Sequence, residues 1–347
     1  MKISEIGEFG LIDMIAGMIA GHRDEAAESS KRLIIGIGDD AALWKGSERT
    51  QVATTDTLVE GVHFALKFCD WESLGWKALA VNLSDIAAMG AYPLYAFVSL
   101  SLPGHVLVQD VASFYNGMLD LCSKSGTTIA GGNCSSSNKV VITLAVVGEV
   151  DAGRTLLRSS AEPGDVVAMT GFTGLAAAGL KRLQAEGRSN ARNRAEIAGG
   201  GRESESLLEE AFLRPWPRLK EAQFLAGKGV KAAIDVSDGL LKDLGHICES
   251  SKVEAEVNTG SVPVHSLLKE YSGRNALKLA LGGGEDYELV FTASKKTLSK
   301  VKAGIGCPVT VIGKVTGKSE AGKLIIRDEK GKVVSPGKYG WEHFKQS

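Results

Sequence analysis

Acidic side chains close four apolar runs of this sequence, and they are the residues best suited to chemistry. The runs are Leu33–Asp40, Val52–Asp56, Val81–Asp85 and Ala233–Gly239. A carboxylate beside an apolar segment is costly in its charged form, and several such groups close together repel one another. Divalent cations such as Mg²⁺, which keep water ligands and bridge to phosphate oxygens, offset both costs. The pattern therefore predicts an enzyme that uses metal ions and phosphate compounds.

Each of these aspartates, taken alone, has a simpler interpretation as a turn former or a helix cap. Asp85 fits the interior of a helix, and Asp238 followed by Gly239 fits the start of one. Asp56 is harder to explain in this way, because strands are poor in aspartate. Four such placements in one chain favour a metal cluster over four unrelated caps.

Two glycine-rich segments would let the backbone approach a ligand closely. Gly282–Glu285 precedes an expected strand and has a flexible turn as its alternative interpretation, while Gly131–Asn133 follows an apolar run. His63 and Arg158 are candidates for phosphate contacts, although each alone is more simply a surface residue. Trp341 suits stacking on a planar ligand, or tethering of the C-terminal tail.

Two other segments resemble phosphate-binding loops, and both interpretations fail on physical grounds. Gly36–Ala41 loosely fits a dinucleotide fingerprint, but the two carboxylates inside it would repel a pyrophosphate. Gly313–Ser319 is one residue too short for a P-loop and cannot wrap phosphates in the same way, so it reads as a strand followed by a turn.

The elements that must position these residues follow from hydrophobic periodicity. Helices are expected over 71–89, 108–124 and 175–185, and an amphipathic helix over 11–20. Strands are expected over 95–102, 139–150, 165–170, 231–236, 253–258, 287–292 and 309–315. A boundary near Asp151 predicts two domains, 1–150 and 151–347. Residues 186–206 have few apolar anchors, which predicts a flexible surface insertion away from the site.

Composition narrows the class of protein. A chain of 347 residues suggests two domains, and 44% hydrophobic with 23% charged residues is ordinary for a globular protein. The formal net charge of -1 gives no basic surface for nucleic acid. The five widely spaced cysteines suit free thiols in a reducing compartment, and no apolar run is long enough to cross a membrane. We therefore expect a cytoplasmic protein that binds neither nucleic acid nor membrane.

Five ordered segments of the chain resemble the thiamine-monophosphate kinase family. They are Gly36–Ala42, Thr54–Phe64, Lys77–Gly90, Ile234–His246 and Gly282–Phe291. The resemblance implies an α/β architecture of the α+β type, with the two-domain fold of aminoimidazole ribonucleotide synthetase. An N-terminal mixed-sheet domain would bind ATP and magnesium and form a homodimer. A C-terminal α/β domain would complete the nucleotide and substrate site.

The resemblance also implies an activity: phosphorylation of thiamine monophosphate to thiamine diphosphate, with ATP as co-substrate and several Mg²⁺ ions. The implied metal ligands are Asp40, Thr54, Thr55, Asp56, Asp85, Asn133, Asp235 and Asp238. The implied ATP contacts are Gly132, Asn133, Arg158 and Ser237. The implied contacts to the thiamine substrate are His63, Glu285 and Trp341. Asp39 and Asp286 have no implied role.

The expected mechanism requires no catalytic nucleophile on the protein. The attacking phosphate oxygen is already ionised at neutral pH, so metal ions that bridge the two anions and align them are sufficient. We therefore expect direct in-line transfer of the γ-phosphoryl group without a covalent phospho-enzyme.

One position departs from the family pattern. The family usually has Gly-Gly-Asp-Thr where this chain has Gly131-Gly132-Asn133-Cys134. Asn133 offers a neutral oxygen in place of a carboxylate, which leads to the hypothesis that one metal is bound more weakly. Two alternatives stay open: another ATP-dependent enzyme of the superfamily, such as an aminoimidazole ribonucleotide synthetase, and a weakly active protein that binds nucleotide or thiamine phosphate.

Overall fold

The structure is a computed structural model that describes residues 1–186, 203–335 and 340. Contacts between residues divide the described chain into two compact units. The first unit comprises Met1–Ile86 and Tyr92–Val150, and the second comprises Ala87–Ala91, Asp151–Ala185 and the described residues beyond 202.

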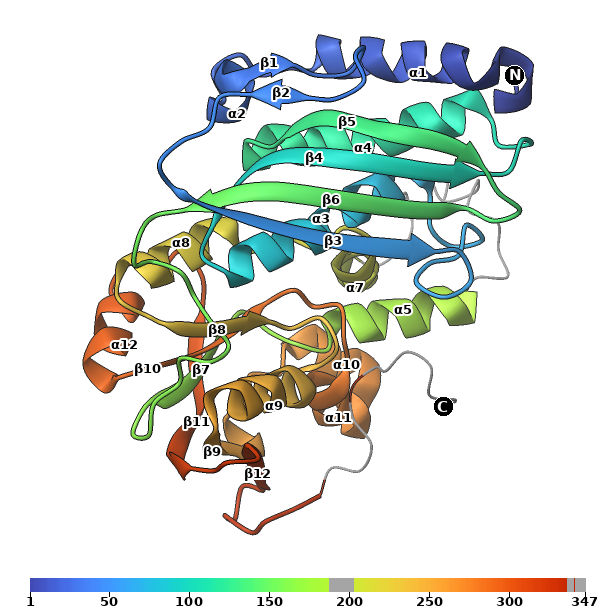
Figure 1. Ribbon diagram of the computed structural model, residues 1–347. Helices are drawn as coiled ribbons and strands as arrows, with labels where there is room; N and C mark the ends of the chain where they lie inside the picture. Colours follow the sequence, from blue (N-terminus) through green and yellow to red (C-terminus); the bar gives the residue numbers. More distant parts are fainter. Residues whose placement is uncertain (187–202, 336–339, 341–347) are drawn as a thin grey trace. The chain divides into compact units, whose positions relative to one another are not determined.

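The first unit is built on a four-stranded mixed sheet in the order β3-β6-β4-β5 (Figure 1). The strands are β3 (Thr50–Val59), β4 (Tyr92–Leu102), β5 (Thr128–Ser136) and β6 (Val141–Val150). β6 pairs antiparallel with both β3 and β4, whereas β4 and β5 are parallel. Along β6 alternate residues are buried and half-buried, as expected for a sheet with only one fully covered face.

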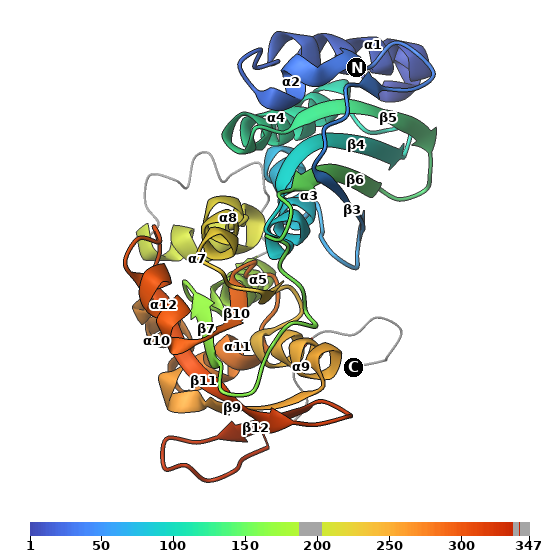
Figure 2. The ribbon, with the colours of Figure 1, turned by 60° about the vertical axis from the view of Figure 1, so that its left-hand side comes forward.

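Helices α3 (Trp71–Ala88) and α4 (Val108–Ser125) pack on the buried face of this sheet (Figure 2). Nearly every residue of α3 is buried. The N-terminus of α3 is capped by Asp70, whose Oδ1 accepts a hydrogen bond of 2.8 Å from the Ser73 N–H. The helix stops before Gly90, which has a φ of 71°. The sequence thus fixes both ends of the helix that carries Asp85.

A short hairpin and two helices complete the first unit. They are α1 (Ile3–Gly21), α2 (Glu28–Arg32), β1 (Leu33–Ile35) and β2 (Leu43–Trp44). The Trp44 ring lies 4.9 Å from that of Tyr95 and 6.2 Å from that of Phe97, measured between centroids. These aromatic contacts seat the hairpin on the sheet at β4, so the loop between β1 and β2 is held near this strand.

The second unit has a six-stranded sheet in the order β12-β9-β11-β7-β10-β8. The strands are β7 (Val166–Thr170), β8 (Ala232–Asp235), β9 (Val253–Asn258), β10 (Leu289–Ala293), β11 (Val309–Lys318) and β12 (Lys323–Arg327). All neighbours pair antiparallel except β12 and β9, which are parallel.

Seven described helices accompany this sheet. They are α5 (Leu175–Glu186), α7 (Glu203–Leu213), α8 (Leu219–Gly227), α9 (Leu240–Ser251), α10 (Ser266–Ser272), α11 (Ala276–Gly282) and α12 (Lys295–Lys302). Buried side chains of α9 and α11 share one hydrophobic core with β7, β8 and β9. Two short 3₁₀ turns, Thr259–Ser261 and Gly273–Asn275, flank α10.

The expected elements are confirmed with small shifts at their ends, except that the helix expected over 11–20 begins eight residues earlier, at Ile3. The strand expected from Tyr95 begins at Tyr92, and β11 continues to Lys318, so most of the P-loop-like segment is strand. The apolar run from Leu33 forms a strand only as far as Ile35. No helix among the described residues is long and apolar enough to cross a membrane. Most of the expected insertion at 186–206 lies outside the described residues.

Candidate active site

Two expected metal ligands come together in the first unit, Asp56 on β3 and Asp85 on α3. The Thr54 hydroxyl donates a hydrogen bond of 2.5 Å to Asp85 Oδ2, which joins strand and helix. Burial, and then the negative charge of Asp85, raises the pKa of Asp56 to about 6. Two carboxylates that disfavour each other's charge, beside a hydroxyl, form a hard-oxygen site suited to a divalent cation.

Thr55 and Asn133 lie on the other face of the same sheet. Side chains alternate along a strand, so Thr55 points away from Asp85, and its hydroxyl donates to the Leu144 carbonyl at 2.9 Å. The strand register aligns Asn133 with Ser99, which lies in the same row as Thr57. Asn133 is therefore on the face opposite Asp56 and three strands away, about 14 Å at the usual strand spacing. The side chains of Thr55 and Asn133 are therefore not brought together with Asp56 and Asp85 within the first unit.

Asp40 lies in the loop between β1 and β2 and is exposed. Its N–H donates a hydrogen bond of 2.8 Å to Asp39 Oδ1, so the neighbouring aspartate shapes the turn. The hairpin that carries this loop is seated on the sheet face that holds Phe97, which pairs with Ala145 in the row of Thr55. The hairpin that carries Asp40 thus lies on the face of the sheet that bears Thr55, opposite the face that bears Thr54, the partner of Asp85.

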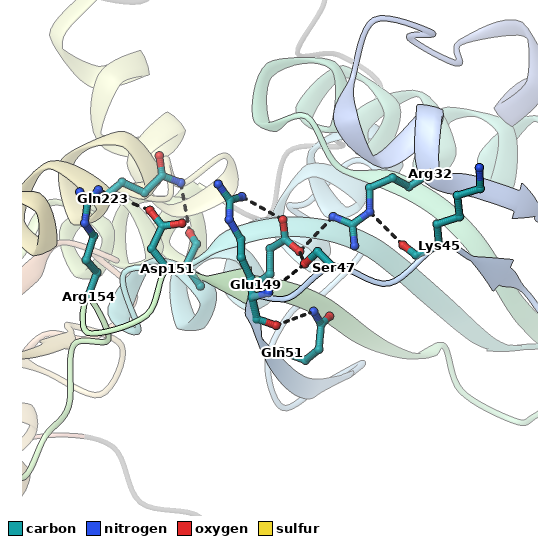
Figure 3. A network of polar contacts seen from close by, with 10 residues as sticks. Arg32, Lys45, Ser47, Gln51, Glu149, Asp151, Arg154 and Gln223 are labelled. Atoms are coloured by element: carbon teal, nitrogen blue, oxygen red, sulfur yellow. Dashed lines mark hydrogen bonds and ion pairs between the residues drawn. The ribbon is translucent and has the colours of Figure 1, made fainter.

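A buried carboxylate, Glu149, anchors the base of this hairpin (Figure 3). Its Oε2 accepts hydrogen bonds from Arg32 at 2.9 Å and from Ser47 at 2.6 Å, and its Oε1 accepts one from Arg49 at 2.9 Å. Arg32 Nε also donates to the Lys45 carbonyl at 2.9 Å. Burial alone would raise the pKa of Glu149, but these three hydrogen bonds lower it below its ordinary value. The network fixes both ends of the hairpin relative to β6.

Two further candidates lie at strand ends or edges of the first unit. Gly132 leaves no room for a side chain, because a Cβ there would lie 2.0 Å from the Val98 carbonyl oxygen. His63 lies in the turn that follows β3, and its Nδ1 accepts a hydrogen bond of 3.0 Å from the Val59 N–H. This contact fixes the orientation of the imidazole ring relative to the end of β3.

In the second unit, Asp235, Ser237 and Asp238 follow one another at the end of β8. Asp235 is buried, whereas Ser237 and Asp238 are half-buried. Lys242 Nζ lies 2.6 Å from Asp238 Oδ2, one turn along α9, so this carboxylate already has a cationic partner. A metal ion at Asp238 would have to share the carboxylate with this lysine.

The loop that carries Asp238 is held by a second aspartate, Asp243. One oxygen of Asp243 accepts hydrogen bonds of 3.0 Å from the N–H groups of Asp238 and of Gly239. Gly239 has a φ of 128°, a conformation that favours glycine, and it directly precedes α9. The sequence Asp-Gly followed by Asp four residues later is thus a helix-start motif that also orients Asp238.

Glu285 lies in the loop 282–288, which runs beside the loop 235–239. Its N–H donates a hydrogen bond of 2.7 Å to the Ser237 carbonyl. A Cβ at Gly284 would come within 2.4 Å of that same carbonyl oxygen, so the close approach requires glycine. The expected ligands Glu285, Ser237 and Asp238 are therefore brought together.

Arg158 is not part of this group within the second unit. Its side chain is exposed, and its carbonyl accepts a hydrogen bond of 2.7 Å from the hydroxyl of Ser251. Ser251 is the last residue of α9, whereas Asp238 precedes the first, about 18 Å away along a helix of this length. Trp341 lies outside the described residues.

Most of the proposed metal-binding carboxylates occur in pairs, and a pair is enough protein ligand for Mg²⁺. Among described residues, no three His, Cys, Asp or Glu side chains form a group able to hold a metal ion. Mg²⁺ is commonly held by one or two carboxylates together with waters and substrate phosphates, so a pair is a sufficient protein contribution. Asp56 with Asp85, and Asp235 with Asp238, meet that requirement by residue type.

Sequence reasoning missed three residues that shape the site: Asp243, Lys242 and Asp286. The spacing of Lys242 four residues after Asp238 indicates an ion pair on a helix and was available from the sequence. Asp286 contacts residues 110 and 112 positions earlier, so no local pattern reveals it.

The chain matches two family models. Residues 38–150 match the AIR synthase related protein, N-terminal domain, and residues 162–325 match the AIR synthase related protein, C-terminal domain. The two-domain architecture expected from the sequence is thereby confirmed.

Matches to individual proteins narrow the family further than the two domain models do. The thiamine-monophosphate kinase of Escherichia coli (strain K12) is 38% identical over 343 residues, covering 97% of this chain and 98% of that protein. The crystal structure of the thiamine-monophosphate kinase from Stenotrophomonas maltophilia K279a superposes with a TM-score of 0.77 at 35% identity, covering 93% of this chain and 96% of that one.

A third relative was solved with ligands. The structure described as AaThiL complexed with AMPPCP and TMP has a TM-score of 0.74 at 34% identity and covers 99% of both chains. Taken with the two family models and the E. coli protein, these matches span nearly the whole sequence. The chain belongs to the thiamine-monophosphate kinase family.

Proposed function

We propose that the protein phosphorylates thiamine monophosphate to thiamine diphosphate, with ATP as the phosphoryl donor. The observation that carries this proposal is the near full-length identity of 34–38% to thiamine-monophosphate kinases and to a relative bound to AMPPCP and TMP. AMPPCP is an analogue of ATP, so that relative binds a nucleoside triphosphate analogue together with TMP. The paired carboxylates and close-packed glycine loops suit the same chemistry.

We propose that several Mg²⁺ ions assist the transfer. The proposed ligands are Asp40, Thr54, Thr55, Asp56, Asp85, Asn133, Asp235 and Asp238. The pair Asp56 and Asp85 supports this, because its two carboxylates raise each other's free energy until a cation neutralises them. Bound metal would neutralise phosphate charge and align the two anions.

We propose that the remaining site residues bind the two substrates. Gly132, Asn133, Arg158 and Ser237 would contact ATP, and His63, Glu285 and Trp341 would contact thiamine monophosphate. Two features support this assignment: the hydrogen bond from the Val59 N–H orients the His63 ring, and the backbone contact to Ser237 fixes Glu285.

The proposed reaction is a direct in-line transfer. ATP and thiamine monophosphate are both anions, so their mutual repulsion is the main obstacle that the protein must reduce. The acceptor phosphate oxygen is ionised at neutral pH and needs no general base. We therefore propose that no protein side chain forms a covalent intermediate.

The deciding experiment measures thiamine diphosphate formed from thiamine monophosphate, ATP and Mg²⁺, with the Asp56→Asn variant as control. We expect product with the parent protein and a large loss with the variant. Nucleotide and thiamine monophosphate binding without product would instead support a weakly active binding protein. Product from a different acceptor would support another enzyme of the superfamily.

We propose the domain limits 1–150 and 151–347, a homodimer formed through the first domain, and a cytoplasmic location. The five cysteines are all free thiols, which supports a reducing compartment. The half-buried face of the four-stranded sheet, with Ala145 near its centre, supports a contact between two copies.

A further inference from the structure

Asp286 lies between two residues in an unfavourable backbone conformation. Glu285 has a φ of 66° and Tyr287 a φ of 51°, both in the left-handed region. For residues other than glycine this conformation is unfavourable, so the surrounding structure must hold them there. Both residues belong to the loop 282–288, which carries a proposed substrate contact.

The side chain of Asp286 supplies one such restraint. Its Oδ2 accepts a hydrogen bond of 2.6 Å from the Gly174 N–H, and its Oδ1 accepts one of 3.1 Å from the Ala176 N–H. These donors lie at the N-terminus of α5, where backbone N–H groups have no partner within the helix. Asp286 therefore caps a helix that begins more than a hundred residues earlier in the chain.

The backbone on either side of Asp286 is tied to the loop 235–239. The Glu285 N–H donates to the Ser237 carbonyl at 2.7 Å, and the Tyr287 N–H donates to the Val236 carbonyl at 2.9 Å. The Val236 N–H donates in turn to the Glu288 carbonyl at 2.7 Å. Any displacement of Asp286 is thus transmitted to both loops.

The other end of the loop has its own anchor. Glu288 accepts a hydrogen bond of 2.6 Å from the Thr170 hydroxyl and is bound by Arg218 through two bonds of 2.7 and 2.8 Å. These contacts fix the start of β10 but do not reach α5. The segment before the loop is tied to the start of α5 by the Thr173 hydroxyl, which donates to the Ala280 carbonyl at 2.7 Å. The Asp286 carboxyl group adds hydrogen bonds to α5 from the middle of the loop, between the two residues with positive φ.

We propose that Asp286 is a positioning residue for the reaction: by capping α5, it holds the two loops that present Glu285, Ser237 and Asp238. Asp286 is assigned to positioning because each of its oxygens accepts a hydrogen bond from a backbone N–H at the start of α5. The role of the two loops in the reaction rests on the proposed function, whereas the restraint of the loops by Asp286 does not.

The test uses the full-length protein and three variants: Asp286→Ala, which removes both acceptors; Asp286→Asn, which keeps one; and Asp70→Ala as a matched control. Asp70 caps α3 through the Ser73 N–H in the same manner, at the end of that helix remote from Asp85. The first readout is hydrogen–deuterium exchange of the loops 282–288 and 235–239. The second is the split between KM and kcat with thiamine monophosphate.

We expect Asp286→Ala to accelerate exchange in both loops and to raise the KM for thiamine monophosphate about tenfold, the size expected when buried hydrogen bonds are lost. Asp286→Asn should give a smaller change of the same kind. Asp70→Ala should lower the unfolding temperature without altering loop exchange or KM.

A lower unfolding temperature with unchanged exchange in both loops would reduce Asp286 to an ordinary helix cap and overturn the proposal. If Asp286→Ala does not fold, Asp286→Asn decides by the same readouts. A parent protein without kinase activity would refute the proposed function, while the exchange measurement would still decide whether Asp286 restrains the loops.

Discussion

At the scale of single residues, the site consists of carboxylates with different tasks. Asp56 and Asp85 face each other as a pair, whereas one oxygen of Asp243 and both oxygens of Asp286 accept hydrogen bonds from backbone N–H groups. The first pair places two negative charges close together, and the second two act on the shape of loops. Residue type alone does not separate these tasks, because all four are aspartates.

Asp56→Asn should weaken the response of the protein to Mg²⁺. The substitution deletes one of two carboxylates that repel each other, so the metal-free variant should be more stable than the parent. Mg²⁺ should raise the unfolding temperature of the parent, because a ligand that binds only the folded state stabilises it, and should raise that of the variant by less. Differential scanning fluorimetry with and without EDTA measures both. Equal Mg²⁺ shifts in the two proteins would exclude Asp56 as a ligand.

Asp286 should make stability depend on pH. Burial, with the negative charges of Glu288 and Glu285, raises the pKa of Asp286 to about 8, although hydrogen bonds from Gly174 and Ala176 oppose this. A carboxyl group with a raised folded-state pKa gives stability that is fully present below its unfolded value and is lost as pH rises towards 8.

The free energy of unfolding of the parent, minus that of Asp286→Asn, should therefore fall between pH 5 and pH 8. Asparagine does not titrate, so a pH-independent cost of the substitution shifts this difference equally at every pH and leaves its change with pH unaffected. Urea unfolding at several pH values provides the measurement. Parallel stability curves for the two proteins would show that the carboxyl group does not titrate in this range.

At the scale of elements, glycines and ion pairs place the loops of the site. Gly284 allows the loop 282–288 to approach Ser237, and the Glu149 network fixes the hairpin that carries Asp40. The close approach at Gly284 depends on the absence of a side chain and the Glu149 network on charge, so each leads to a separate prediction.

Gly284→Ala should impair activity more than stability. A Cβ at this position would lie 2.4 Å from the Ser237 carbonyl oxygen, so the loop must move away. Gly317→Ala is a matched control, because a Cβ there would meet nothing within 4 Å. We expect kcat/KM to fall at least about tenfold for Gly284→Ala, equivalent to about 1.4 kcal/mol, and to be unchanged for the control. Similar kinetics in both variants would show that the close approach is not needed.

Glu149→Gln should destabilise the protein strongly. It leaves Arg32 buried without its charge partner, which typically costs about 3 kcal/mol or more. Asp120→Asn breaks an exposed ion pair with Lys124 and should cost less than about 1 kcal/mol. Because the pKa of Glu149 is lowered, its contribution is present above its unfolded pKa and is lost as pH falls through the folded value. Urea unfolding at neutral pH compares the two variants, and equal losses would contradict a structural role for the network.

Most elements were predictable from the sequence because periodicity and caps are local signals. The helix over 71–89 ends where Gly90 indicated, and the β-branched run before Asp151 is β6. Which of the proposed ligands lie on the same face of the sheet was harder to predict. Thr54 and Thr55 are neighbours in sequence, yet strand alternation places them on opposite faces. That Asn133 shares a face with Thr55 follows only from the pairing registers that link β5 to β4, β4 to β6 and β6 to β3.

At the scale of the whole molecule, the proposed dimer has a direct test. Ala145 lies on the incompletely covered face of the four-stranded sheet, and a charged side chain there would oppose contact with a second copy. Ala145→Arg should convert a dimer to a monomer in sedimentation velocity. Ala303→Arg, at an exposed position after α12, is the control and should leave the mass unchanged. A parent protein that sediments as a monomer would refute the dimer.

The cap that Asp286 provides for α5 also bears on how the chain folds during synthesis. Gly174 leaves the ribosome 112 residues before Asp286, which corresponds to roughly 5–20 s at ordinary translation rates. Throughout this interval the start of α5 lacks its acceptor, and β7 lacks its neighbour β10. β7, β8 and β9 have emerged by the end of this interval, but no two of them are neighbours in the sheet, so none of its strand pairs can form until β10 and β11 arrive, and these apolar strands stay open to aggregation until then.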